Sequence, residues 1–373
     1  MALMPLLSTA QITSGYYRVH NRATERFMSI VDTNAPVEVD GTRVIADLRA
    51  IHMLKGFEDS VAYNPATICY IEYISSTVKG AKYNLLGQGL NFHTSTEGRY
   101  LDAEKNGDYY LIYVQETRSG LTVKKFLMDD AGRYDDYLYP DISDYSTSKS
   151  LNWSVLPVDQ SDTQYFGIKP DVKAAADNSY WSTLYAGFPF KASDSSMKTY
   201  IVKTVDKALG YAVIAEVDDV PAELPVLIRC AGETPITNKT TLLSPTTTAS
   251  YGSNYLVGNY YCNEVEASTG HRNVKAYNPS TMRMLGTTED GKPAFVKSNI
   301  SYLPANKCYL AVSSDAPDVL QIVTEAEYAT GIHELNVSST TDDSKVIYDL
   351  QGRRVTAPKK GLYIVNGKKV IIK

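Results

Sequence analysis

The sequence predicts an all-β protein, because short runs of alternating apolar and polar residues recur along the 373 residues and are separated by turn residues. Tyrosine is unusually abundant, with 29 residues against 8 phenylalanines and 2 tryptophans, and tyrosine suits half-exposed strand faces. A third indication is the pair Asn366-Gly367, since both residues tolerate the positive φ of a tight hairpin turn. These observations together predict strands joined by tight turns.

Length and composition limit the kind of protein this can be. The chain is long enough for two or three domains of about 150 residues each, and its 43% hydrophobic and 21% charged residues are ordinary for a globular protein. The net charge of -5 opposes binding to nucleic acid or anionic lipid, because both require a basic face. No run approaches the ~18 apolar residues of a membrane span. We therefore expect neither a nucleic-acid partner nor a membrane span.

Changes of pattern divide the chain into four segments. Residues 1–14 lack the charged start and the length of a full signal peptide, and we expect a trimmed leader or an engineered start. Residues 15–159 consist of short runs such as "TICYIEYI" and "YYLIYVQE", separated by turn pairs such as Asn106-Gly107. Residues 160–330 contain longer strand runs separated by Pro, Ser and Thr, which predict a β-sandwich. Residues 331–373 predict a short β-hairpin unit.

One stretch of the first segment has a helical period instead. Its apolar residues recur about one helical turn apart, and a glycine follows them: Val44, Leu48, Ile51, Leu54 and Gly56. We therefore predict one short helix near Ile45 to Leu54.

The first segment also carries a weak internal repeat of an aromatic or leucine residue, a polar turn and an acidic residue. The pieces "GYYRVHN…RFMSIVD", "GRYLD" and "NWSVLPVD" resemble the β-trefoil of ricin-type lectins, particularly the version at the start of secreted Bacteroidetes proteins. The resemblance covers residues 15–159 and implies a β-trefoil-like domain with a pseudo-threefold repeat. The Gln-x-Trp signature of sugar-binding trefoils is absent, and Asn152-Trp153 stands at the nearest position.

The other two segments carry resemblances as well. "STLYAGFPF", "VPAELPVLI" and "LPANKCYLAV" resemble a β-module that recurs before the C-terminus of Bacteroidetes surface proteins. "VIYDLQGRRV…KKGLYIVNGKKVIIK" is similar to the C-terminal domains that sort proteins to the cell surface through type IX secretion. The resemblance implies a secreted or outer-membrane surface location, with residues 331–373 read by the secretion machinery as a sorting or attachment unit.

Within the C-terminal segment we expect hairpins turning at Gly352 and Gly367. Alternation predicts one apolar face, packed on another strand or on the central module: Val346, Tyr348, Leu350, Leu362, Ile364, Val370 and Ile372. Basic residues are expected on the outer rim: Arg353, Arg354, Lys359, Lys360, Lys368 and Lys369.

Catalytic motifs and metal-ligand spacings are not found in the sequence. "GTTEDGKP" has the glycines and lysine of a phosphate-binding loop, but Pro293 stands where a Ser or Thr must bind magnesium. The five histidines are scattered, with no two at ligand spacing. We therefore predict no catalytic residues, no metal and no cofactor, although a triad of distant residues would leave no sequence signal.

The four cysteines are far apart: Cys69, Cys230, Cys262 and Cys308. They either form up to two disulfides or remain buried small hydrophobes. If Cys230 and Cys262 are paired at all, we expect them to pair with each other, because both belong to the central segment.

The most suggestive cluster for ligand binding is "DDAGRYDDYLYPDISDY", residues 129–145, which interleaves aspartates with tyrosines. Aromatic faces stack on sugar rings and carboxylates accept hydrogen bonds from hydroxyls, so this loop is a candidate glycan site. Calcium binding and a merely solvated acidic loop are the alternatives. The predicted ligand-binding residues are Tyr134, Asp135, Asp136, Tyr137, Tyr139 and Trp153.

We therefore expect a non-catalytic secreted or cell-surface binding protein that recognises a glycan or a surface protein. The alternatives are a structural or accessory component of a surface assembly, and a glycan hydrolase or protease built from scattered residues. Two acidic residues about 5 to 10 Å apart in a pocket would favour the hydrolase.

Overall fold

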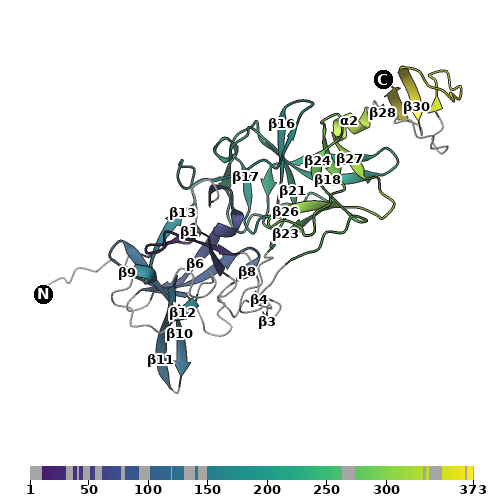
Figure 1. Cartoon of the computed structure of the whole chain (residues 1–373). Helices are drawn as coiled ribbons and strands as arrows, with labels where there is room; N and C mark the ends of the chain where they lie inside the picture. The colour runs from purple at the N-terminus through teal and green to yellow at the C-terminus, as the bar shows by residue number, and fades with distance from the viewer. Residues whose placement is uncertain are drawn as a thin grey trace.

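The structure is a computed structural model that describes residues 11–30, 37–39, 42–44, 51–54, 61–76, 80–91, 101–118, 120–129, 139–141, 149–262, 274–330, 333–335, 347–365 and 368–372. The fold is all-β, as predicted, with sheets of 13, 4, 10 and 4 strands. Figure 1 shows three units in a row, with the C-terminal sheet at the opposite end of the molecule from the β10–β11 hairpin of the N-terminal unit. No helix in the described ranges is long and apolar enough to cross a membrane.

The N-terminal unit holds the 13-stranded sheet. Its strands are β1 (Gly15–Asn21), β2 (Phe27–Ile30), β3 (Val37–Val39), β4 (Thr42–Val44), β5 (Ile51–Leu54), β6 (Cys69–Ser76), β7 (Ala81–Gly87), β8 (Leu90–Asn91), β9 (Leu101–Asn106), β10 (Tyr109–Arg118), β11 (Leu121–Met128), β12 (Tyr139–Asp141) and β13 (Asn152–Pro157). Short 3-10 helices, η2 (Pro65–Thr67) and η4 (Lys149–Leu151), precede β6 and β13.

Six of these strands form a closed ring of antiparallel pairs. β1 pairs with β6 and β13, β6 with β7, β7 with β9, β9 with β10, and β10 with β13. The burial pattern of β7 alternates strictly, so Tyr83 and Leu85 face inward while Lys82 and Asn84 are partly exposed. Inward-facing side chains from the ring, including Val19, Ile71 and Trp153, form one buried cluster. The ring leaves none of these six strands as an open edge.

The predicted helix near Ile45 to Leu54 is wrong where the structure describes it. Ile51–Leu54 is a strand, β5, which pairs antiparallel with β2 in a register that places Ile30 opposite Ile51. The helical spacing depended on four apolar positions, and pairing with β2 supplies hydrogen-bond partners that outweigh such a weak local preference. Residues 45–50 lie outside the described part of the chain.

The central unit contains the four-stranded sheet β14-β22-β17-β20 and a ten-stranded sheet, β15-β16-β21-β18-β19-β27-β25-β24-β26-β23. Its strands are β14 (Phe166–Gly167), β15 (Val172–Ala174), β16 (Ser179–Leu184), β17 (Phe190–Ala192), β18 (Lys198–Asp206), β19 (Tyr211–Val217), β20 (Asp219–Val220), β21 (Val226–Cys230), β22 (Lys239–Leu242), β23 (Leu256–Asn259), β24 (Met282–Thr287), β25 (Pro293–Val296), β26 (Lys307–Ala311) and β27 (Val319–Thr324). The 3-10 helix η5 (Pro235–Asn238) and the helix α2 (Glu325–Ala329) complete it.

The ten-stranded sheet buries side chains on both of its faces. Along β18, Ile201 joins the cluster shared with the four-stranded sheet, whereas Tyr200 and Val202 join a second cluster with Trp181 and Phe295. Successive residues of a strand point to opposite faces, so one strand supplies both clusters. The central unit is therefore built on two cores that share one sheet.

The joint between the N-terminal and central units is buried and polar. Arg18 of β1 is 1% exposed and donates to Thr67 Oγ1 at 3.2 Å. It also donates to two carbonyl oxygens of the central unit, those of Gln164 at 3.2 Å and Tyr165 at 3.0 Å. Burial lowers the pKa of the Arg18 guanidinium to about 10. From the central unit, Tyr261 packs against the N-terminal core and its hydroxyl donates to the carbonyl of Gln88 at 2.8 Å.

The C-terminal unit is a four-stranded sheet in the order β28-β31-β30-β29. Its strands are β28 (His333–Leu335), β29 (Ile347–Tyr348), β30 (Gly361–Val365) and β31 (Lys368–Ile372). The pairing of Val365 with Lys368 confirms the hairpin predicted around Gly367. Gly352, with φ of 77°, ends a turn in which its N–H donates to the carbonyl of Asp349 at 2.9 Å. β31 also pairs with β28 in parallel, which gives the hairpin a further strand at its edge.

The predicted apolar face of this tail needs correction. Val365, Val370 and Ile372 are buried, but Leu362 is 36% exposed and its cross-strand partner Ile371 is also 36% exposed. A two-residue loop pairs even-numbered residues of one strand with odd-numbered residues of the other, so Leu362 cannot share a face with Val370. The exposed face therefore carries its own apolar residues: Tyr348, Leu362, Ile364 and Ile371. The predicted rim is exposed at Arg353, Arg354, Lys359, Lys360 and Lys369, and the Lys368 side chain lies outside the described part.

Cys69, Cys230 and Cys308 are free buried thiols, and Cys262 is partly buried. Because Cys230 is a free thiol, it forms no bridge with Cys262. The structure thus follows the alternative in which buried cysteines act as small hydrophobes.

Candidate functional site

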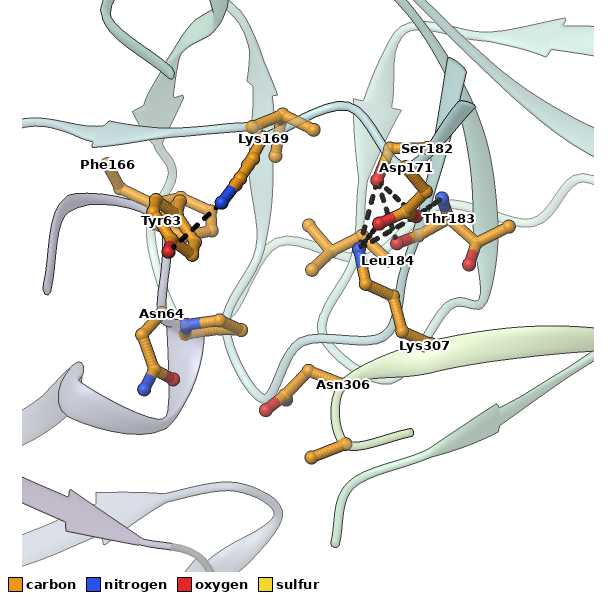
Figure 2. Close-up of a pocket in the computed structure, with 13 residues that line it drawn as sticks. Tyr63, Asn64, Phe166, Lys169, Asp171, Ser182, Thr183, Leu184, Asn306 and Lys307 are labelled. Carbon is orange, nitrogen blue, oxygen red and sulfur yellow. Dashed lines mark hydrogen bonds and ion pairs between the residues drawn. The ribbon is translucent and has the colours of Figure 1, made fainter. Parts of the chain in front are cut away.

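A cleft of about 320 Å³ lies where the N-terminal and central units meet. One wall comes from the segment before β6, and the other walls come from β14, β16 and the start of β26 (Figure 2). Its lining residues are Tyr63, Asn64, Pro65, Phe166, Ile168, Lys169, Asp171, Ser182, Thr183, Leu184, Ala305, Asn306 and Lys307.

An ion pair with two hydroxyl-bearing neighbours forms the polar end of the cleft. Lys307 Nζ lies 2.7 Å from Asp171 Oδ1 and 2.8 Å from Asp171 Oδ2, and it donates to Ser182 Oγ at 3.1 Å. Asp171 Oδ2 also accepts from Ser182 Oγ at 2.9 Å and from the N–H of Thr183 at 3.2 Å. The side chains of Lys307 and Asp171 are 27% and 34% exposed, so both reach solvent in the cleft. The carboxylate is thus fixed in place while one edge remains accessible.

An aromatic ring and a second lysine form the other end (Figure 2). Lys169 Nζ lies 4.8 Å from the centroid of the Tyr63 ring and donates to its hydroxyl at 3.4 Å. Next to Tyr63, Asn64 caps η2, since its Oδ1 accepts from the N–H of Ala66 at 3.0 Å. The cap and the proline at the start of η2 hold the Tyr63 backbone near the lysine.

Apolar side chains form the floor of the cleft between its two polar ends. Phe166, Ile168 and Leu184 are all at most 5% exposed and belong to the core between the two central sheets. Asn306 closes one side, with its amide occupied by Gln88 and by the carbonyl of Tyr185. The cleft thus has a rigid apolar floor with a charged group at each end, an arrangement typical of small-ligand sites.

The ligand-binding residues predicted from the sequence do not gather here. Tyr134, Asp135, Asp136 and Tyr137 lie outside the described part of the chain. Tyr139 begins β12, where its backbone pairs with Met128 of β11.

Trp153 occupies a core position. It is 0% exposed, and its indole N–H donates to the carbonyl of Leu127 at 3.0 Å. The Trp153 indole lies inside the closed ring of six strands and therefore offers no face to a ligand.

Asp129, at the start of the acidic stretch, has a structural role. It is 1% exposed and forms a buried ion pair with Arg26, whose Nε donates to Asp129 Oδ2 at 3.0 Å. Thr24 Oγ1 donates to the same carboxylate oxygen. This end of the stretch is thus tied to the N-terminal unit and is unavailable to a ligand.

Sequence reasoning missed the residues of the cleft. Asp171 and Lys307 are 136 residues apart, and neither belongs to a recognisable motif. Only the pairing of distant strands brings them together. In the ranges that the structure describes, no three His, Cys, Asp or Glu side chains gather closely enough to hold a metal ion.

Comparison with known proteins assigns this chain to no family: no protein-family model matches it, and no curated protein is significantly similar to it.

Proposed function

We propose that this chain is a non-catalytic binding protein and that the cleft between its N-terminal and central units holds one carbohydrate unit. The observation that carries the proposal is the pairing of an apolar floor with hydrogen-bonding groups at both ends. Sugars present apolar ring faces flanked by hydroxyls, and Tyr63, Asp171 and Lys307 are the kinds of side chain that bind them. The volume of about 320 Å³ lies at the lower end of the usual range for ligand sites, which favours a small group such as one sugar ring.

Two features support a binding role over hydrolysis. Of the described residues that line the cleft, Asp171 alone carries a carboxylate, whereas glycoside hydrolysis requires a pair. Asp171 is also held by Lys307, Ser182 and the Thr183 N–H, so it is suited to accept hydrogen bonds from a ligand without exchanging a proton.

The proposal extends to the finer architecture and to the location. The closed ring of six strands in the N-terminal unit supports a β-trefoil-like domain, and the packing of two sheets over one core supports a β-sandwich in the central unit. The resemblance of residues 331–373 to type IX sorting domains supports a secreted or outer-membrane surface protein.

A glycan array probed with the full-length chain, followed by calorimetry with the best ligand, tests the proposal. We expect Tyr63→Ala and Asp171→Asn each to weaken binding about tenfold or more, because each removes a ligand contact from a partly buried site. Asp194→Asn is the matched control, since Asp194 is an exposed aspartate elsewhere in the central unit and should leave affinity unchanged. Failure to retain any glycan, or equal binding by all three variants, would overturn the proposal.

A second candidate function is that of an accessory component of a surface assembly. The observation that favours it is the exposed apolar face of the C-terminal sheet, where Leu362 and Ile371 lie opposite each other. An exposed apolar patch with a basic rim is typical of a protein interface. We expect Leu362→Lys to reduce retention at the cell surface without changing ligand affinity at the cleft. Unchanged retention would remove this candidate.

A further inference from the structure

A second hollow, of about 500 Å³, lies on the central unit and shares no lining residue with the cleft. It opens at the face of the ten-stranded sheet that carries Trp181 and Tyr200, opposite the face that packs on the four-stranded sheet. β16, β18, β21 and β27 supply its floor, and α2 lies at one end. The hollow is therefore built on paired strands that hold its side chains rigidly.

The aromatic part of the hollow is a pair of rings. The ring centroids of Trp181 and Tyr200 are 6.1 Å apart, with an interplanar angle of 32°. The Trp181 N–H is occupied by Ser179 Oγ at 2.7 Å, which fixes the indole. Tyr200 is 9% exposed, yet its hydroxyl has no hydrogen-bond partner among the described residues. Burial raises the pKa of Tyr200, so the phenol keeps its proton and can donate. The hydroxyl lies on the wall of the hollow and is reached by solvent, so it is available to donate to a ligand.

Arg229 provides the cationic part of the hollow. Its register partner across β16 and β21 is Trp181, and both residues line the hollow. The guanidinium is 49% exposed and lies 3.8 Å from Asp177 Oδ2, which is too long for a hydrogen bond. Asp177 Oδ1 is already occupied by the N–H and hydroxyl of Ser179. Among the described residues, the guanidinium donors of Arg229 have no hydrogen-bond acceptor.

The opposite end provides acceptors and an amide. Glu327 Oε2 accepts from the N–H and hydroxyl of Thr324 at 2.7 and 2.8 Å, and Glu327 Oε1 has no partner among the described residues. The side-chain amide of Gln321, on β27, is also without a hydrogen bond in the described part. Tyr200, Arg229 and Glu327 all line this one hollow.

We propose that this hollow is a second ligand site, separate from the cleft, and that it binds a saccharide carrying a carboxylate, such as a hexuronate. The Arg229 guanidinium matches a planar carboxylate in a bidentate pair. The Tyr200 hydroxyl, the Gln321 amide and Glu327 Oε1 bond to ring hydroxyls, and Trp181 with Tyr200 contacts the apolar ring face. The volume of about 500 Å³ accommodates more than the single sugar unit proposed for the cleft.

Calorimetry with the full chain tests this site, with a glucuronate-containing disaccharide as the probe and the matching neutral glucose disaccharide as the comparison. We expect Arg229→Gln to weaken binding of the uronate about tenfold or more, and Tyr200→Phe to weaken it several-fold, because both remove a donor in a partly desolvated site. Thermal melts of both variants should match the wild type, since neither side chain makes a hydrogen bond within the described protein. Lys203→Gln is the control for net charge, because Lys203 is an exposed cation on β18 outside the hollow.

The outcomes separate this site from the cleft. Binding of the uronate that survives Asp171→Asn but not Arg229→Gln supports the second site, whatever the cleft binds. Three results overturn it: no binding of the uronate by the wild type, equal affinity for the neutral disaccharide, or an Arg229→Gln variant that binds as well as the wild type.

Discussion

Gln88 and Asn306 are 218 residues apart in the sequence, yet their amides form two reciprocal hydrogen bonds of 2.9 and 2.8 Å in the buried joint between the N-terminal and central units. Gln88 Nε2 donates to Asn306 Oδ1, and Asn306 Nδ2 donates back to Gln88 Oε1. Both residues have left-handed backbones, with φ of 49° and 56°. The joint that forms the cleft therefore depends on two conformations that few residues adopt readily.

Replacing either amide with glycine should destabilise the chain. We expect Gln88→Gly and Asn306→Gly each to cost about 1–3 kcal/mol, because the remaining amide is left buried without its partner. The double variant should cost less than the sum of the two, by about 0.5–3 kcal/mol. Urea unfolding of the wild type, the two single variants and the double variant measures this double-mutant cycle. Strictly additive losses in the free energy of unfolding would contradict the pairing of the two amides. Asn178→Gly is the matched control, since Asn178 is an exposed asparagine with φ of 58° and no amide pair, and it should be neutral or slightly stabilising.

Loss of the acidic residue should destabilise the protein much more at a buried ion pair than at an exposed one. Asp129→Ala removes the carboxylate of a buried ion pair with Arg26, which is 8% exposed, and we expect a loss of about 3–5 kcal/mol. Asp315→Asn removes an exposed partner of Lys207 and should cost less than about 1 kcal/mol. Denaturant melts of both variants check this contrast. Similar losses for the two would show that Asp129 and Arg26 are not buried together.

Alkaline pH should destabilise the protein through its buried thiols. Burial raises the pKa of Cys69, Cys230 and Cys308 from an ordinary value of 9.0 to about 12. Below pH 9 these thiols are protonated in both states, whereas between about pH 9 and 12 the unfolded chain loses their protons first, so the free energy of unfolding falls as pH rises. The slope is at most about 1.4 kcal/mol per pH unit for each thiol.

Urea unfolding at several pH values above about 8 measures this slope. We expect Cys308→Ala to make it shallower than in the wild type, while the tyrosines whose pKa burial raises contribute equally to both proteins. Parallel curves for wild type and variant would contradict the assignment for Cys308.

Removal of residues 331–373 should leave the rest of the chain almost as stable as before. The described buried clusters of the N-terminal and central units include no residue after Tyr328, so we expect the melting temperature to change by less than about 2 °C. Cell fractionation of the native host should at the same time show reduced surface delivery, if the segment is a sorting unit.

The matched comparison removes residues 325–373. This longer deletion takes away α2, whose Tyr328 packs against Tyr211 and Val213 and donates to Asp206 Oδ2 at 2.7 Å. We therefore expect it to lower the melting temperature clearly. Equal melting of both truncations would show that Tyr328 contributes nothing to the central core.

Local chemistry allowed good predictions where neighbouring residues decide the structure. The Asn366-Gly367 pair predicts the hairpin that joins β30 to β31, because few dipeptides adopt a two-residue turn. The prediction for the two faces of the same hairpin was wrong. It placed even-numbered residues of both strands on one face, whereas a two-residue turn pairs even-numbered residues of one strand with odd-numbered residues of the other. The short helix was predicted from spacing alone, and pairing with β2 decided the outcome.

The cleft could not be predicted, because its chemistry depends on contacts between distant segments. Nothing in the sequence around Ser182 distinguishes it from other serines in strands. Its hydroxyl becomes part of the cleft only because the fold places Lys307 and Asp171 beside it. Trp153 shows the opposite case. A tryptophan close to a predicted ligand-binding stretch suggests a ligand contact, but complete burial and a hydrogen bond to the Leu127 carbonyl assign Trp153 to the core.

The pairing of β1 with β13 also sets an order of events on the ribosome. Val19 lies opposite Val155, and the N–H of Val158 donates to the carbonyl of Tyr16 at 2.9 Å. Ribosomes add about 5–20 residues per second, so the first strand emerges several seconds before the strand that closes its ring. During that interval β1 presents an unpaired edge to the crowded cell. A nascent chain of this protein should therefore depend on chaperones until Pro157 has left the exit tunnel, and ribosome stalling before that residue should produce aggregates, whereas stalling after it should not.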